Sequence, residues 1–176
     1  MVRIHDRPFV ELYWIPLGAG NRVVGVTRRV YRLLTGALPY HAALAVEVDG
    51  ARWVIEMTPA ARGEHGAVVH GPVGVPHSPI RYEIRRWRDG VIPDERFAVA
   101  THAVSEDAAT ARRLLELVPS VPPHTWARWN SNSIVAWLLV SSGADVSAVH
   151  PPRGGCAPGW ELGVRSAAAR PSAGGR

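Results

Sequence analysis

Two β-rich stretches joined by a tight turn constrain the fold of this chain more than any other feature. Residues 41–48 and 52–57 are dominated by aliphatic and aromatic side chains, and Asp49 and Gly50 separate them. An Asp-Gly pair between two such stretches is a strong signal for a β-hairpin. Pairing Val48 with Ala51 sets the register of both strands, and a four-residue loop that starts at Val48 sets the same register. The sequence therefore predicts an antiparallel hairpin of known alignment.

This register brings a histidine and a carboxylate together. Glu56 lies opposite Ala43 in the predicted pairing. Since side chains alternate between the two faces of a strand, Ala43 shares its face with His41. Glu56 is then the diagonal neighbour of His41, within reach of a long side chain. We expect these two residues to form one polar unit on the sheet.

A second strong signal is an apolar helix with a polar start. Residues 134–140 are apolar on nearly every side, which is typical of a buried helix. Asn130, Ser131 and Ser133 stand at its beginning, and Gly143 follows its end. Helix capping alone selects Asn and Ser at such positions, so Ser131 is either a capping residue or a functional one.

The remaining pattern predicts one α+β domain. The chain has 176 residues, of which 47% are hydrophobic, and this is enough to form one domain around a single hydrophobic core. We expect the domain to span residues 1–164, and the Ala-, Ser-, Gly- and Pro-rich residues 165–176 to form a disordered tail. A helix should begin after Asn21, and the residues predicted for its buried side are Val23, Val24, Val30, Tyr31 and Leu34.

Charge and cysteine content narrow the classes of function. The net charge is +5, and every basic side chain counted in it is an arginine, because the sequence has no lysine. The arginines are scattered in small clusters. Nucleic-acid binding is therefore disfavoured, although an arginine-mediated nucleic-acid or anionic-surface binder stays open. The single cysteine, Cys156, excludes an internal disulfide and a multi-cysteine zinc site. No apolar run spans a bilayer and no secretory signal is present, which predicts a cytoplasmic protein.

The two polar sites together resemble a family pattern. A strand that begins with His41, followed later by Asn-Ser-Asn-Ser-Ile at residues 130–134, is similar to the circularly permuted papain-like thiol hydrolases, such as the PPPDE deubiquitinating or deSUMOylating peptidases. In that permuted order, which differs from ordinary papain and NlpC/P60 enzymes, the histidine strand precedes the nucleophile helix. An uncharacterised bacterial family with Asn-Ser-Asn-Thr-Phe followed by Pro-Pro is closer still, and Pro151 and Pro152 are similar to that segment.

The resemblance implies a permuted papain-like fold, with an antiparallel sheet packed against the buried helix, and a hydrolase or acyltransferase. Ser131 would be the nucleophile at the positive end of the helix dipole, and His41 would be its general base. Glu56 would orient the imidazole. The residues expected to shape the substrate site are Asn130, Asn132, Trp129 and Ser133. The substrate would be an amide, ester or thioester of a peptide, acyl group or other small molecule.

This chain departs from the family at the nucleophile, where serine replaces cysteine. A thiol is partly ionised near neutral pH, whereas a serine hydroxyl needs a hydrogen-bonded base throughout the attack. Ser131 is therefore either a working serine supported by Glu56 or the relic of a lost active site. In the second case the domain is a non-catalytic module that binds a peptide or acylated ligand.

Other chemical interpretations of the sequence are weaker. Ser133 competes with Ser131 as nucleophile, because first-turn positions are hard to assign from sequence. Cys156 is an alternative nucleophile without a helix start to lower its pKa. His65, His70 and His77 match no standard zinc spacing. No phosphate loop, dinucleotide fingerprint or metal-ligand set is present, so we expect neither cofactor nor metal.

Overall fold

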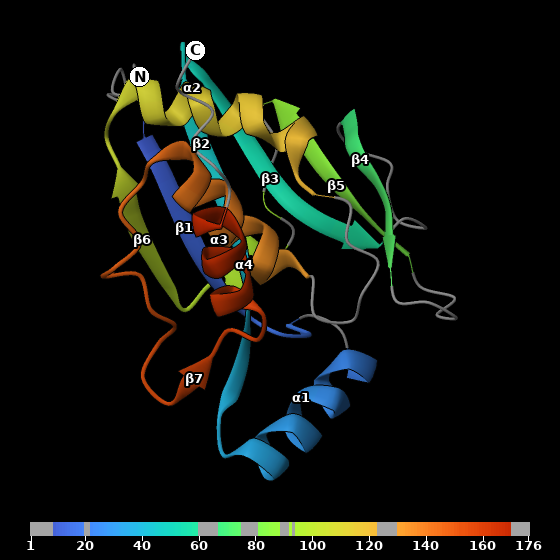
Figure 1. Ribbon diagram of the computed structural model, residues 1–176. Helices are drawn as coiled ribbons and strands as arrows, with labels where there is room; N and C mark the ends of the chain where they lie inside the picture. The colour runs from blue at the N-terminus through green and yellow to red at the C-terminus, as the bar shows by residue number, and fades with distance from the viewer. Residues whose placement is uncertain are drawn as a thin grey trace, which may run out of the picture.

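The computed structural model describes residues 9–19, 22–59, 67–74, 81–88, 92, 94–122 and 130–169. These residues form an α+β fold (Figure 1). The elements in chain order are β1 (Phe9–Pro16), α1 (Arg22–Thr35), β2 (Leu38–Val48), β3 (Ala51–Pro59), β4 (Ala67–Gly74), β5 (Arg81–Arg88), β6 (Ala100–Ser105), α2 (Ala108–Leu117), α3 (Ser131–Ser142), β7 (Gly155–Cys156) and α4 (Trp160–Ala168).

The strands form one sheet in the order β4-β5-β3-β2-β1-β6, and all neighbouring pairs in this order are antiparallel. The predicted hairpin is confirmed in position and register, because Val48 pairs with Ala51 and Leu44 pairs with Ile55. Its turn has positive φ at both Asp49 (53°) and Gly50 (68°). Such dihedrals match the right-handed twist of the two strands, which explains why this dipeptide sets the alignment.

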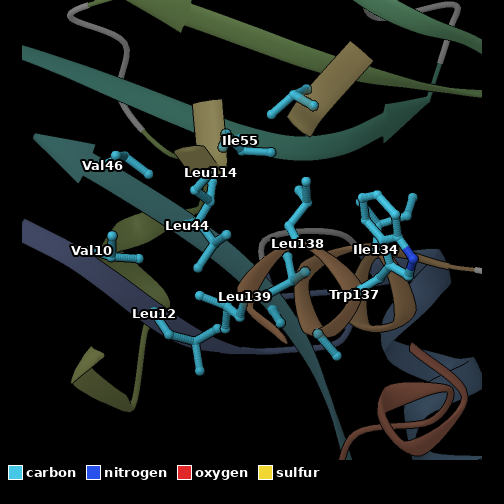
Figure 2. Packing of buried hydrophobic residues seen from close by; sticks show 14 of the residues in the cluster. Val10, Leu12, Leu44, Val46, Ile55, Leu114, Ile134, Trp137, Leu138 and Leu139 are labelled. Atoms are coloured by element: carbon cyan, nitrogen blue, oxygen red, sulfur yellow. The ribbon is translucent and has the colours of Figure 1, made fainter. Parts of the chain in front are cut away.

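Helices α2, α3 and α4 cover one face of the sheet (Figure 1). Side chains from β1, β2 and β3 meet those of α2 and α3 in the main core, as Figure 2 shows for Leu44, Ile55, Leu114 and Leu138. Helix α4 joins this core through Trp160, whose ring centroid lies 5.3 Å from that of Trp14. A smaller apolar cluster on the opposite face includes Tyr13, Ile15, Ala43, Ala45, Val54 and Ile92.

Helix α3 lies within the core, as its apolar sequence predicted. Side chains on all its sides are buried, including Trp137 and Leu138 at 0% exposure. The helix ends at Gly143, whose φ of 91° suits a glycine C-cap. Helix α4 packs directly against it, and Gly163 lies so close that a Cβ would stand 2.1 Å from the Ser133 carbonyl oxygen.

The sheet opens where α3 begins. In the described chain the β2–β3 ladder extends from Val48–Ala51 only to Leu44–Ile55. Strand β2 then continues beside β1 as far as Tyr40, while β3 continues beside β5 as far as Pro59. The backbone of β2 before Leu44 therefore needs other hydrogen-bond partners on the side that β3 leaves.

The structure corrects two expectations outside the site. Helix α1 forms as predicted, but Val30 and Leu34, expected on its buried side, are 49% and 79% exposed. Helix α1 stands apart from the other helices (Figure 1), so the described residues supply little to cover it. The tail predicted from residue 165 is also wrong at its start, because α4 continues to Ala168 and buries Ala167. Among the described residues, no helix combines the length and apolarity needed to cross a bilayer.

Candidate active site

Ser131 and His41 are in direct contact although they lie far apart in the sequence. Ser131 is the first residue of α3, and His41 lies in β2 near the opening of the sheet. The Ser131 Oγ atom is 2.6 Å from His41 Nδ1, which is a hydrogen bond. The arrangement places a hydroxyl beside an imidazole at the N-terminus of a buried helix, where the dipole favours negative charge.

Glu56 holds the other side of the imidazole. Its Oε1 atom lies 3.0 Å from His41 Nε2. A carboxylate can only accept, so it keeps the ring proton on Nε2 and leaves Nδ1 as an acceptor for the Ser131 hydroxyl. The Glu56 side chain is 8% exposed and that of His41 is 17% exposed, so the pair is shielded from bulk water. The second carboxylate atom, Glu56 Oε2, is buried with no hydrogen-bond partner within the described part of the chain.

The cap of α3 is Asn130, which leaves the Ser131 hydroxyl free for His41. The Asn130 side-chain oxygen accepts from the backbone N–H groups of Asn132 and Ser133. The Ser133 hydroxyl accepts in turn from the Asn130 N–H at 3.3 Å, completing a reciprocal capping box. Ser133 is 0% exposed. The geometry thus places the Ser131 hydroxyl, and not that of Ser133, beside His41.

The Asn132 side chain joins α3 to the open edge of β2. Its Oδ1 accepts from the Ala42 N–H at 2.8 Å, and its Nδ2 donates to the Tyr40 carbonyl at 2.9 Å and to the Pro158 carbonyl at 3.1 Å. Tyr40 and Ala42 belong to the part of β2 that β3 has left, whereas Pro158 lies in the segment between β7 and α4. Both amide hydrogens of Asn132 are thus used within the protein, where they help to position α3; that Asn132 also shapes the substrate site stays a prediction.

Within the described residues, one backbone donor at the start of α3 has no partner. The N–H groups of Asn132 and Ser133 donate to Asn130 Oδ1, and the Ile134 N–H donates to the Asn130 carbonyl. The Ser131 N–H has no partner among the residues that the structure describes. A backbone N–H at the start of a helix is the kind of donor that can stabilise negative charge.

A pocket of about 370 Å³ borders the site at Asn130. Its lining is partly apolar and includes one acidic residue, Glu161, and one basic residue, Arg165. The other lining residues are Asn130, Ala157, Pro158, Gly159 and Leu162. Asn130 Nδ2 donates to the Pro158 carbonyl at 3.0 Å, so the wall of the pocket is tied to the cap of α3. Asn130 is therefore the residue that links the pocket to the site, since Ser131, His41 and Glu56 are not among the lining residues.

Of the other candidate residues, the structure describes Cys156 and the backbone of His70. Trp129 is outside the described residues, as are His65 and His77, and the side chain of His70 is not described. Cys156 lies in β7, with its thiol 3.7 Å from the Tyr31 hydroxyl. Both ring nitrogens of His41 already have partners, so neither is available to Cys156. Within the described residues, no group of three His, Cys, Asp or Glu side chains is placed to hold a metal ion.

Sequence reasoning missed the contribution of the backbone to this site. The Pro158 carbonyl accepts from both Asn130 and Asn132, and the Tyr40 carbonyl accepts from Asn132. The only signal in the sequence is the proline and glycine content of residues 151–159, which indicates an irregular segment but not its partners.

Comparisons with protein-family models, with curated proteins and with solved structures give no match for this chain.

Proposed function

We propose that the protein is a serine-dependent hydrolase or acyltransferase of circularly permuted papain-like architecture. The observation that carries this proposal is the chain of contacts from Ser131 through His41 to Glu56, at 2.6 Å and 3.0 Å. A nucleophile, a base and an orienting carboxylate within hydrogen-bond reach form the arrangement that acyl transfer requires. The order of the histidine strand and the serine helix along the chain also supports the architecture.

In the proposed reaction Ser131 Oγ attacks the carbonyl carbon of an amide, ester or thioester. Its proton passes to His41 Nδ1 as the new C–O bond forms, and Glu56 stabilises the imidazolium. The tetrahedral intermediate expels its amine, alcohol or thiol leaving group, which takes the proton from His41. Water or a second acceptor then attacks the acyl-Ser131 ester with the same base, and Ser131 regains its proton.

The oxyanion would be stabilised at the start of α3. The Ser131 N–H, which has no partner among the described residues, and the positive end of the helix dipole both favour negative charge there. Asn130 and Ser133 stabilise this turn through the capping box, and Asn132 fixes it against β2. We assign the acyl or peptide part of the substrate to the pocket beside Asn130, whose apolar wall contains Ala157, Pro158 and Leu162.

Hydrolysis of an activated ester such as p-nitrophenyl acetate tests the proposal. The wild-type protein should release p-nitrophenol at a rate that Ser131→Ala lowers by about 100-fold or more, as loss of a nucleophile does. Ser141→Ala is the matched control, since Ser141 lies at the opposite end of α3 and its hydroxyl has no partner within the described residues. Equal rates for wild type and Ser131→Ala across a panel of amides, esters and thioesters would refute a catalytic role.

A non-catalytic papain-like module is the second candidate, and one observation favours it. Ser131 is only 8% exposed, whereas a substrate carbonyl must approach the nucleophile to about 3 Å. In such a module the contacts of Ser131 and His41 stabilise the fold, and the pocket at Asn130 binds a peptide or acylated ligand. Binding of an acylated peptide without turnover, unchanged in Ser131→Ala, would support this module over the enzyme.

A further inference from the structure

Helix α1 presents an apolar stripe to solvent. Val26, Val30, Leu33 and Leu34 are 59%, 49%, 86% and 79% exposed. Their spacing places them on one side of the helix, in the pattern that usually faces a core. Contiguous exposed apolar side chains of this kind are typical of surfaces that bind a protein, a ligand or a membrane.

The same helix is strongly basic. Its residues 22–35 include Arg22, Arg28, Arg29 and Arg32 and no acidic residue. Arg29 is three positions after Val26 and four before Leu33, so it borders the apolar stripe. Arg29 and Arg32 are exposed, and none of the ion pairs found among the described residues involves them. Their charge is therefore available to an anionic partner.

The body of the protein holds α1 on the side away from this stripe. The Cys156 thiol in β7 lies 3.7 Å from the hydroxyl of Tyr31, which is half-buried. Helix α1 also contacts β2, and Figure 1 shows it below the layer formed by α2, α3 and α4. The helix is thus attached along one side while Val26, Val30, Leu33 and Leu34 remain exposed.

We propose that α1 docks in the plane of an anionic lipid membrane. An amphipathic helix with an apolar stripe and arginines beside it buries the stripe at the boundary of headgroups and acyl chains, while the guanidinium groups bind lipid phosphates. A second copy of the chain fits less well, because pairing two stripes would bring together the Arg29 side chains that border them, with no acidic residue on either helix to offset their charge. A nucleic acid would pair with the arginines but leave Leu33 and Leu34 in water.

Sedimentation with vesicles of phosphatidylcholine alone, or of equal parts phosphatidylcholine and phosphatidylglycerol, tests the docking. The wild type should bind the anionic vesicles and not the neutral ones. Arg29→Gln with Arg32→Gln should weaken binding about 30-fold, since each basic residue near an anionic surface contributes a several-fold factor. Leu33→Ser with Leu34→Ser should weaken it at least about 10-fold.

Matched controls keep the test specific to α1. Arg96→Gln with Arg113→Gln removes the same charge from exposed positions outside α1, and Val99→Ser removes an apolar side chain that is 55% exposed. Both should bind as the wild type does, as should Ser131→Ala, which makes the docking independent of the proposed catalysis. Circular dichroism checks that each variant is folded.

Three results would overturn the proposal. The first is that the wild-type protein does not bind anionic vesicles, or that it binds neutral vesicles equally well. The second is weakening by the Arg96 and Arg113 pair equal to that by the Arg29 and Arg32 pair. The third is light scattering that shows a dimer in the wild type and a monomer in the Leu33 and Leu34 variant, which would assign the stripe to a second copy.

Discussion

The Asn132 side chain accepts a hydrogen bond from the Ala42 backbone N–H at 2.8 Å, in the part of β2 that β3 has left. Ala42 is adjacent to His41, and Asn132 is adjacent to Ser131. One buried amide therefore fixes both halves of the candidate site relative to each other. The alignment of hydroxyl and imidazole depends on this contact as well as on their own hydrogen bond.

Replacing Asn132 with leucine should destabilise the fold strongly. The variant leaves the Ala42 N–H and the Tyr40 carbonyl buried without their partner, and each such group costs about 1–3 kcal/mol. We expect the free energy of unfolding to fall by about 3 kcal/mol in urea denaturation. Ser141→Ala on the same helix should change it by less than about 0.5 kcal/mol. A small change in Asn132→Leu would mean that the amide is not a structural link.

The direction in which Gly163→Ala changes the stability of the fold tests the packing of α4 on α3. Alanine at an ordinary helix position is better than glycine by about 1 kcal/mol. At Gly163, however, the added Cβ would stand 2.1 Å from the Ser133 carbonyl oxygen, so α4 must move away from the first turn of α3. We expect a lower denaturation midpoint, whereas Ser166→Ala in the same helix should leave it nearly unchanged. A higher midpoint for Gly163→Ala would contradict the packing of α3 on α4.

Glu56→Gln should lower the rate of serine acylation by about 10²- to 10⁴-fold, in the range of such changes in other serine enzymes. The neutral amide no longer stabilises the imidazolium, and it can donate to His41 Nε2, which would move the ring proton to Nδ1. Stopped-flow release of p-nitrophenol measures this step. Glu116→Gln, at an exposed position of α2, should retain the full rate. A retained rate in Glu56→Gln would remove this carboxylate from the mechanism.

Tyr13 should make stability fall at high pH. Burial, followed by its hydrogen bond to Glu11, raises the pKa of Tyr13 to about 12. Because the folded value exceeds the ordinary value of 10.0, the contribution is complete below pH 10 and is lost as the pH rises toward 12. Urea midpoints across this range should fall less steeply in Tyr13→Phe than in the wild type. Parallel curves for the two proteins would contradict the raised pKa.

The local signals in the sequence were sufficient to predict the hairpin and the position of Glu56 beside His41. The Asp49-Gly50 turn fixed the register, and alternation then placed Glu56 beside His41, where the structure has it. That Ser131 meets His41 depended on resemblance, because no periodicity relates α3 to β2. The predictions of buried side chains failed where burial depends on whether another helix or strand packs against the residue. An amphipathic pattern identifies the apolar side of α1, but it does not show whether anything packs on Val30 or Leu34.

The contribution of Asn132 could not be predicted from the sequence for a related reason. Its partners are backbone groups that become available only because β2 and β3 separate before Leu44. The point at which two strands separate depends on how the whole sheet is assembled. The types of side chain along β2 and β3 do not predict it.

Covalent labelling with a fluorophosphonate tests the central claim, a serine activated by His41, most directly. The reagent phosphonylates an activated serine hydroxyl with loss of fluoride, and peptide mass spectrometry locates the adduct. The account predicts an adduct on Ser131 in the wild type and in Ser141→Ala, and none on that residue in His41→Ala. An unlabelled Ser131, or equal labelling of Ser131 without His41, would contradict it.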